Sequence, residues 1–143
     1  MAHVHVGSQG VPLDLMAAGI KSVFDFVAEV NAATSSGGSG SGQIDTLDVG
    51  GGLGVNFGSE EVTPSFADMV QRLEAEVPTL FNKEARGIPH IITEYGRALS
   101  AKSGWFGCRV EYAKRSGGRK IVAQHAGVDL CVRTVYHAEQ WPV

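Results

Sequence analysis

The chain has 143 residues, 43% hydrophobic and 19% charged, the composition of an ordinary globular protein. Its formal net charge is −3 and its twelve Lys and Arg are scattered, which argues against a nucleic-acid-binding surface, so no DNA or RNA partner is expected. No apolar run approaches the roughly 20 residues that span a bilayer, so we expect no membrane partner and a soluble protein, with the cytoplasm favoured.

The first part of the chain predicts a strand, a helix and a second strand. Residues 3–6, "HVHV", predict a short buried strand that ends at Gly7. Apolar side chains then recur with helical spacing from Pro12 to Val30. Residues 31–43 are rich in Gly and Ser and predict a flexible surface loop. Residues 44–49 predict the second strand, which ends at the run "GGGLG".

A second helix and a third strand follow. An apolar stripe begins near Pro64, and Pro78 is expected to kink or shorten this helix. Residues 88–93 predict the third strand. Alternating strands and helices are typical of βαβ units with parallel strands.

The pattern changes near residue 103. Residues 105–112, 120–124 and 130–136 predict strands with no helical stripe between them. We therefore expect two parts: residues 1–102 in an α/β architecture, and residues 103–143 at the start of an antiparallel β domain. Cys108 and Cys131 have no metal-binding spacing and are expected to be reduced core residues.

The three predicted strand ends share polar residues and glycines. Parallel β/α folds place their sites at the carboxyl ends of the strands. The residues at these ends are His5, Gly7 and Ser8, then Asp48 and Gly50 to Gly52, then Glu94, Gly96 and Arg97. Three such ends in succession predict one shared ligand pocket.

The glycine run indicates an anionic ligand. Residues without Cβ let successive backbone N–H groups approach one phosphate. The run "GGGLG" matches neither GxGxxG nor a P-loop, and a simple turn is the alternative. Arg97 and the Ser8 hydroxyl favour a phosphate or carboxylate.

Glu94 would repel an anion unless it faces a cationic part of the same ligand, such as a pyridinium nitrogen. A surface ion pair with Arg97 is the alternative for Glu94. His3 and His5 share a strand face, but His90, His125 and His137 are poorly placed to complete a metal site, so no metal is expected. We interpret His3 as a core residue and His5 as a residue that stacks on an aromatic cofactor.

The segments "HVHVGSQ", "LDVGGGLGV" and "ITEYGRAL" together resemble the pyridoxal-phosphate decarboxylases of the ornithine, diaminopimelate and arginine group. The resemblance covers nearly the whole chain. It implies a partial alanine-racemase-like (β/α) barrel that leads into a C-terminal β domain. It also implies pyridoxal 5′-phosphate as cofactor, an amino acid as small-molecule substrate and a homodimeric full-length protein.

The resemblance assigns a role to each position that matches. His5 would stack on the pyridine ring, and Glu94 would bond its nitrogen. Ser8 and the Gly50, Gly51 and Gly52 amides would hold the phosphate, and Gly96 would contact the cofactor. Arg97 would serve the phosphate or the substrate carboxylate. Arg133 and Tyr136 in "DLCVRTVY" would contact the substrate, although Arg and Tyr are three residues apart there instead of the usual four. Tyr95 replaces a usual proline, which arginine-type members also lack.

The family's lysine that binds the cofactor covalently and its C-terminal catalytic Cys have no counterpart in this chain. We therefore expect an internal fragment that holds no catalytic residue, is inactive alone and is poorly folded alone, because such a barrel needs about 250 residues. The function expected of the full-length protein is removal of an α-carboxylate as CO2. The alternatives are a non-catalytic regulator of the same fold, or a metal-dependent hydrolase that uses His3 and His5.

Overall fold

The computed structural model describes residues 1–35, 43–82, 84, 87–88 and 90–139. These residues form two compact units. The first unit contains Met1–Asn56 and Glu61–Lys102, and the second contains Phe57–Glu60 and the residues from Ser103 onward. Each unit is described by itself.

A three-stranded parallel sheet is the centre of the first unit. Its strands are β1 (Ala2–His3), β2 (Thr46–Asp48) and β3 (His90–Ile92), in the order β1-β2-β3. His3 pairs with Asp48, and Asp48 pairs with Ile92. The parallel βαβ arrangement expected from the sequence is therefore confirmed, with shorter strands than predicted.

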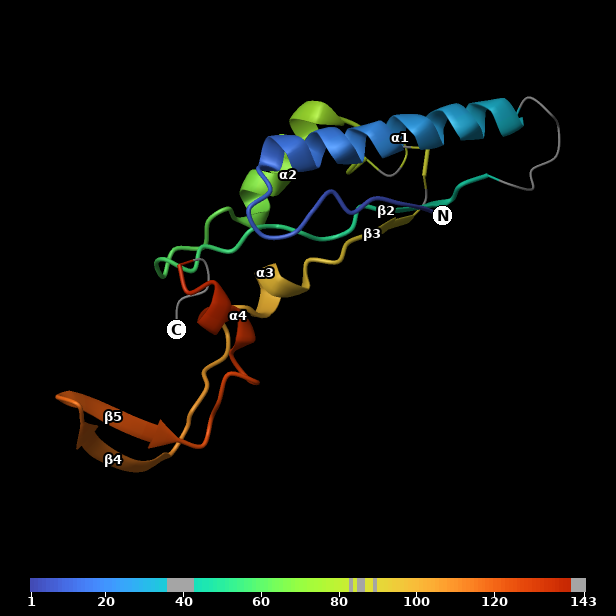
Figure 1. Cartoon of the computed structure of the whole chain (residues 1–143). Coiled ribbons are helices and arrows are strands. Elements are labelled where there is room, and N and C mark those ends of the chain that lie inside the picture. Colours follow the sequence, from blue (N-terminus) through green and yellow to red (C-terminus); the bar gives the residue numbers. More distant parts are fainter. Residues whose placement is uncertain (36–42, 83, 85–86, 89, 140–143) are drawn as a thin grey trace. The chain divides into compact units, whose positions relative to one another are not determined.

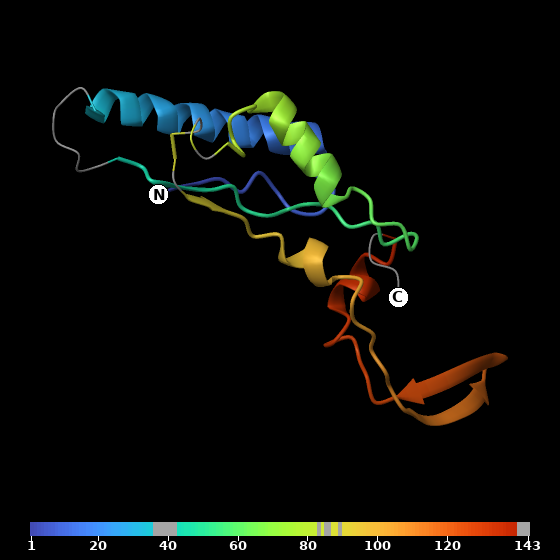
Figure 2. The same ribbon diagram turned by 180° about the vertical axis from the view of Figure 1, so that it is seen from behind.

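Two helices cover one face of this sheet, as Figures 1 and 2 show from opposite sides. They are α1 (Leu13–Ser35) and α2 (Phe66–Glu76), and the short α3 (Gly96–Ser100) follows β3. The core lies between the helices and the sheet because alternate strand residues and helix residues three or four apart point toward it. Its buried apolar side chains are Met16, Ala17, Ile20, Phe24, Val27, Leu47, Val49, Leu53, Met69, Leu73, Val77, Leu80, Ile88 and Tyr95.

Nearby residues in the sequence determine where α2 begins and ends. α2 begins at a capping box, in which the Ser65 hydroxyl accepts the Asp68 N–H and the Asp68 carboxylate accepts the Ser65 N–H. It ends at Glu76, two residues before Pro78, so the expected shortening is confirmed.

α1 continues to Ser35, and the prediction of a loop from residue 31 is wrong for residues 31–35. The Asn31 side chain bonds both the N–H and the C=O of Ile44, which ties this last turn to the approach to β2. Residues 36–42 of the predicted loop lie outside the described residues.

The face of the sheet away from α1 and α2 carries ionisable side chains. His3 is exposed and pairs with Asp48, so its interpretation as a core residue is wrong. The cause is the strand period of two, which sends Ala2 and Val4 toward the helices and His3 and His5 away from them.

The second unit contains the antiparallel hairpin of β4 (Val110–Ser116) and β5 (Arg119–Gln124). Gly117 and Gly118 form its turn with φ of 57° and 76°, values that favour glycine. Residues 105–109 precede the strand instead of starting it. The predicted strand at residues 130–136 is wrong, because Val132–Tyr136 forms the short helix α4 with local bonds such as Val135 N–H to Cys131 C=O.

The described part of the second unit contains no fully buried side chain. Cys108 is exposed and Cys131 is half-buried, so their expected place in a core is wrong for this structure. The Cys108 thiol instead donates to the Gln124 side-chain oxygen across the hairpin.

Candidate functional site

The carboxyl ends of the three parallel strands meet at one pocket of about 200 Å³. It takes residues from the segments after β1, β2 and β3, which are separate in sequence. Its lining residues are His5, Ser8, Gly52, Leu53, Glu94, Tyr95, Gly96, Arg97 and Ala98. The structure thus brings together six of the predicted cofactor-contacting residues, which are His5, Ser8, Gly52, Glu94, Gly96 and Arg97.

Gly50, Gly51 and Gly52 pass so close to neighbouring backbone that a side chain has no room. A Cβ atom would lie 2.4 Å from the Val4 carbonyl oxygen at Gly50, and 1.9 Å from the Gly7 carbonyl oxygen at Gly52. Gly50 and Gly52 also have φ of 69° and 94°. The glycine run therefore packs the end of β2 tightly between the ends of its two neighbours.

The amides of the run do not all face the pocket. The Gly50 N–H donates to Asp48 Oδ1 at 2.9 Å, and the Gly51 N–H donates to His5 Nδ1 at 3.3 Å. Gly52 lines the pocket itself. Of the three predicted amide donors, Gly52 is therefore the one best placed for a ligand anion.

His5 and Glu94 form one side of the site. His5 Nδ1 lies 4.0 Å from Glu94 Oε2, and both side chains are about half-exposed. The bond from Gly51 requires an unprotonated Nδ1, and it fixes the plane of the imidazole ring next to the carboxylate.

Ser8 and Arg97 also line the pocket, and Gln9 lies next to Arg97, outside the lining. Arg97 Nη1 lies 3.5 Å from Gln9 Oε1. The Gln9 side chain donates to the Val55 C=O at 2.6 Å and accepts the Val55 N–H at 2.9 Å. Gln9 therefore holds the loop after the glycine run against the end of β1. The sequence reasoning missed Gln9, although it follows Ser8 directly in the first motif.

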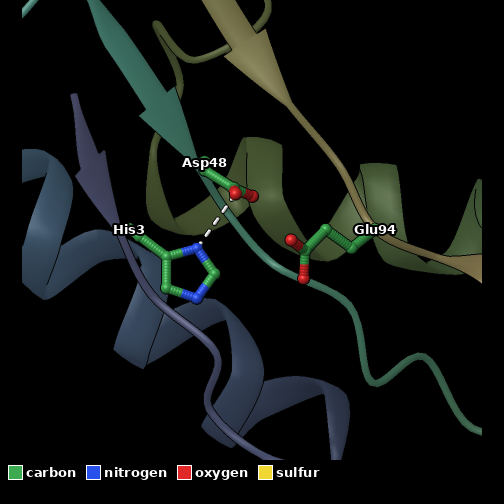
Figure 3. A group of neighbouring side chains, drawn as sticks. All are labelled: His3, Asp48 and Glu94. Atoms are coloured by element: carbon green, nitrogen blue, oxygen red, sulfur yellow. Dashed lines mark ion pairs between the residues drawn. The ribbon is translucent and has the colours of Figure 1, made fainter.

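Asp48 lies at the end of β2, between His3 of β1 and Glu94 after β3, as Figure 3 shows. His3 Nδ1 is 2.9 Å from Asp48 Oδ2, and one ligand atom from each of the three residues lies within 4.8 Å of the others. Burial raises the pKa of Asp48, but the Gly50 N–H and His3 more than offset it and hold the pKa below its usual value. The spacing would suit a cation, but His3 and Asp48 already bond each other.

Tyr95 is a second residue whose role the sequence reasoning missed. Its ring is buried and packs edge-on against Phe66, with ring centroids 5.8 Å apart. Its hydroxyl is buried without a hydrogen-bond partner in the described part of the chain, and burial raises the pKa of Tyr95 to about 12. Tyr95 thus closes the pocket from the core side.

Arg133 and Tyr136 lie on α4 in the second unit and are exposed. Their predicted contact with substrate stays a prediction.

A pocket at the carboxyl ends of parallel strands joined by helices is typical of the class of β/α proteins that hold a small ligand at this edge. Residues 2–101 match the family described as "Pyridoxal-dependent decarboxylase, pyridoxal binding domain". The chain belongs to this family. The expected alanine-racemase-like fold and the pyridoxal-phosphate cofactor of the family are thereby confirmed.

Three relatives illustrate the similarity. The chain is 32% identical over 140 residues to the diaminopimelate decarboxylase of Campylobacter jejuni, covering 95% of this chain and 31% of that protein. It is 31% identical over 108 residues to the biosynthetic arginine decarboxylase of Alkalilimnicola ehrlichii, covering 71% of this chain and 16% of that protein. The crystal structure of Helicobacter pylori diaminopimelate decarboxylase complexed with L-lysine superposes with a TM-score of 0.70 at 26% identity, covering 95% of this chain and 30% of that one. The chain therefore spans less than a third of the length of these relatives.

No helix in the described residues combines the length and apolar character that crossing a membrane requires. The family match also removes the reason to interpret His3 and His5 as a hydrolase metal pair.

Proposed function

We propose that this chain is part of a longer pyridoxal-phosphate-dependent decarboxylase that removes the α-carboxylate of an amino acid as CO2. The observation that carries the proposal is the single pocket in which His5, Ser8, Gly52, Glu94 and Arg97 meet, in a chain of the pyridoxal-dependent decarboxylase family.

The donors of the pocket suit the two ends of this cofactor. Ser8, Gly52 and Arg97 offer a hydroxyl, a backbone amide and a guanidinium to a phosphate. Glu94 offers a carboxylate to a protonated ring nitrogen, and His5 offers a flat ring beside it. A pocket of about 200 Å³ is smaller than the roughly 300–1,000 Å³ of complete small-molecule sites, which supports further walls from the rest of a longer protein.

When bound, pyridoxal phosphate accepts the electron pair that departing CO2 leaves behind. The part of Glu94 is to keep the proton on the ring nitrogen. The part of His5 is to support one ring face and exclude water from it. Arg97, with Ser8 and Gly52, anchors the phosphate and so fixes the position of the ring.

We infer that diaminopimelate is the substrate, with arginine as the second candidate. The relatives that match 92–96% of this chain are diaminopimelate decarboxylases, whereas the arginine decarboxylase matches 71%. Tyr95 stands in place of the usual proline, and this difference is the reason to retain arginine as a candidate substrate. Arg133 and Tyr136 are the proposed substrate contacts from the second unit.

The isolated 143-residue chain is proposed to be inactive, because the described residues that line the pocket include no lysine. The longer protein is proposed to be a cytoplasmic homodimer. Incubation of the isolated chain with pyridoxal phosphate and diaminopimelate should release no CO2, and light scattering of the longer protein should give the mass of two subunits.

The deciding experiment measures CO2 release by the full-length protein from diaminopimelate, arginine and ornithine. Glu94→Gln should abolish release and leave the fold intact, as judged by circular dichroism. Glu29→Gln, an exposed carboxylate on α1, is the matched control and should keep full activity. Unchanged turnover in Glu94→Gln would remove the mechanism, and a full-length protein that folds but binds no cofactor would favour a non-catalytic regulator.

A further inference from the structure

Asp48 is a buried carboxylate at the end of β2, directly before the glycine run. It is 6% exposed, and it is the one charged side chain that is fully buried in the described part of the chain. A buried carboxylate is stable only when its oxygens are bonded. Oδ1 accepts the Gly50 N–H, and Oδ2 pairs with His3 Nδ1, each at 2.9 Å.

Gly50 links Asp48 to the segment that follows β3. Its N–H is held by Asp48, and its C=O accepts the Glu94 N–H at 2.8 Å. Its Cα is pressed against the end of β1. The bonds therefore run without interruption from the His3 side chain, through Asp48 and Gly50, to the backbone of Glu94.

The side chains lie along the same line. One ligand atom each of His3, Asp48 and Glu94 lies within 4.8 Å of the other two, so the Asp48 and Glu94 carboxylates are close neighbours. The His3 imidazole lies against Asp48 and pairs with its Oδ2 atom (Figure 3). His3 is absent from the pocket lining, so it reaches the ligand only through these neighbours.

We propose that His3 and Asp48 are positioning residues that set the place of Glu94 against the cofactor ring, an inference that rests on the proposed function. His3 holds Asp48, Asp48 holds Gly50, and Gly50 holds the backbone of Glu94. Neither side chain touches the cofactor.

The test compares binding of pyridoxal phosphate and of pyridoxal, which lacks the phosphate, to the full-length protein. His3→Leu should weaken both by the same factor of about ten, the effect of losing one hydrogen bond to a charged group. The losses are equal because Glu94 contacts the ring that both ligands share. His3→Asn, whose amide can donate from nearly the position of Nδ1, should restore most of the affinity.

A second readout needs no cofactor. Amide hydrogen exchange at Gly50 and Glu94 should be faster in His3→Leu than in the unmodified protein. Asp48→Ala should have the larger effect, but its buried site makes misfolding a risk, so the half-exposed His3 decides the question. His90→Leu is the matched control, because His90 is an exposed histidine at the opposite end of β3 and should change neither affinity.

Equal affinities in His3→Leu and the unmodified protein would overturn the proposal. So would a loss confined to pyridoxal phosphate, because the effect would then run through the phosphate site and not through Glu94. Failure of His3→Asn to restore binding would also overturn it. If the unmodified full-length protein binds neither ligand, the proposed function itself fails, and the two failures are thereby distinguished.

Discussion

Gly51 lies directly against the carbonyl oxygen of Glu94, and a Cβ atom at Gly51 would be 2.4 Å from that oxygen. No real Cβ atom tolerates such a contact with backbone, so the end of β3 would have to move. Glu94 is the residue whose carboxylate faces the pocket. The absence of one methyl group at Gly51 is therefore a condition for the geometry of the site.

Gly51→Ala should destabilise the full-length protein by about 1–3 kcal/mol, the usual cost of overpacking, and should weaken cofactor binding. Gly54→Ala is the control within the same run, because its Cβ would meet nothing closer than 3.7 Å, at Pro64. Urea unfolding and cofactor titration measure the two effects. Equal stability of the two variants would show that the end of β3 can shift freely.

The order of strands and helices in the first unit was predictable because its signals are local and agree with each other. The apolar stripe of α1 and the stop before Pro78 each follow from one segment. The same reasoning failed at residues 132–136, where β-branched residues favour a strand but a strand also requires a partner. Whether a partner exists depends on distant parts of the chain.

The part of the site that lies directly after the three strands could be predicted from the sequence. Polar residues and glycines after three parallel strands had to meet at one edge, and the pocket unites four polar residues and two glycines of this set. Gln9 and Asp48 could not be assigned in this way because their roles depend on bonds across the fold, to Val55 and to His3. The Gly50 N–H donates to Asp48 and the Gly51 N–H donates to His5. These partners depend on the backbone conformation, which the sequence alone does not reveal.

Gln9→Ala should loosen the loop around Val55. The variant loses both bonds to the Val55 backbone, which we expect to cost about 1–3 kcal/mol for two neutral hydrogen bonds. Amide exchange at Val55 should quicken, and phosphate-bearing cofactor should bind more weakly because Arg97 loses its neighbour. Gln71→Ala, at an exposed position on α2, is the control and should change neither quantity.

Ser65→Ala should destabilise the protein by about 1 kcal/mol, because it removes the hydroxyl that caps α2. Ser65→Thr retains a capping hydroxyl and should recover most of the loss. Thermal unfolding of the three proteins checks this. A Thr variant as unstable as the Ala variant would mean that packing at position 65, and not the hydroxyl, determines the effect.

Tyr95→Phe should leave the protein as stable as before, or more stable, at neutral pH, because the lost hydroxyl is buried without a partner in the described residues. The raised pKa of Tyr95 also predicts a pH dependence. Below about pH 10 the folded and unfolded chains both keep the phenolic proton. Between about pH 10 and the folded value of about 12, the unfolded chain releases that proton and the folded chain keeps it, so the free energy of unfolding falls as pH rises.

Denaturant midpoints measured across this alkaline range should therefore fall more steeply in the unmodified protein than in Tyr95→Phe. Tyr112→Phe is the matched control, because Tyr112 is 56% exposed and its removal should leave the slope unchanged. If Tyr95→Phe is less stable at neutral pH, the hydroxyl has a partner in the full-length protein. Such a partner would place another segment of the full-length protein against Tyr95.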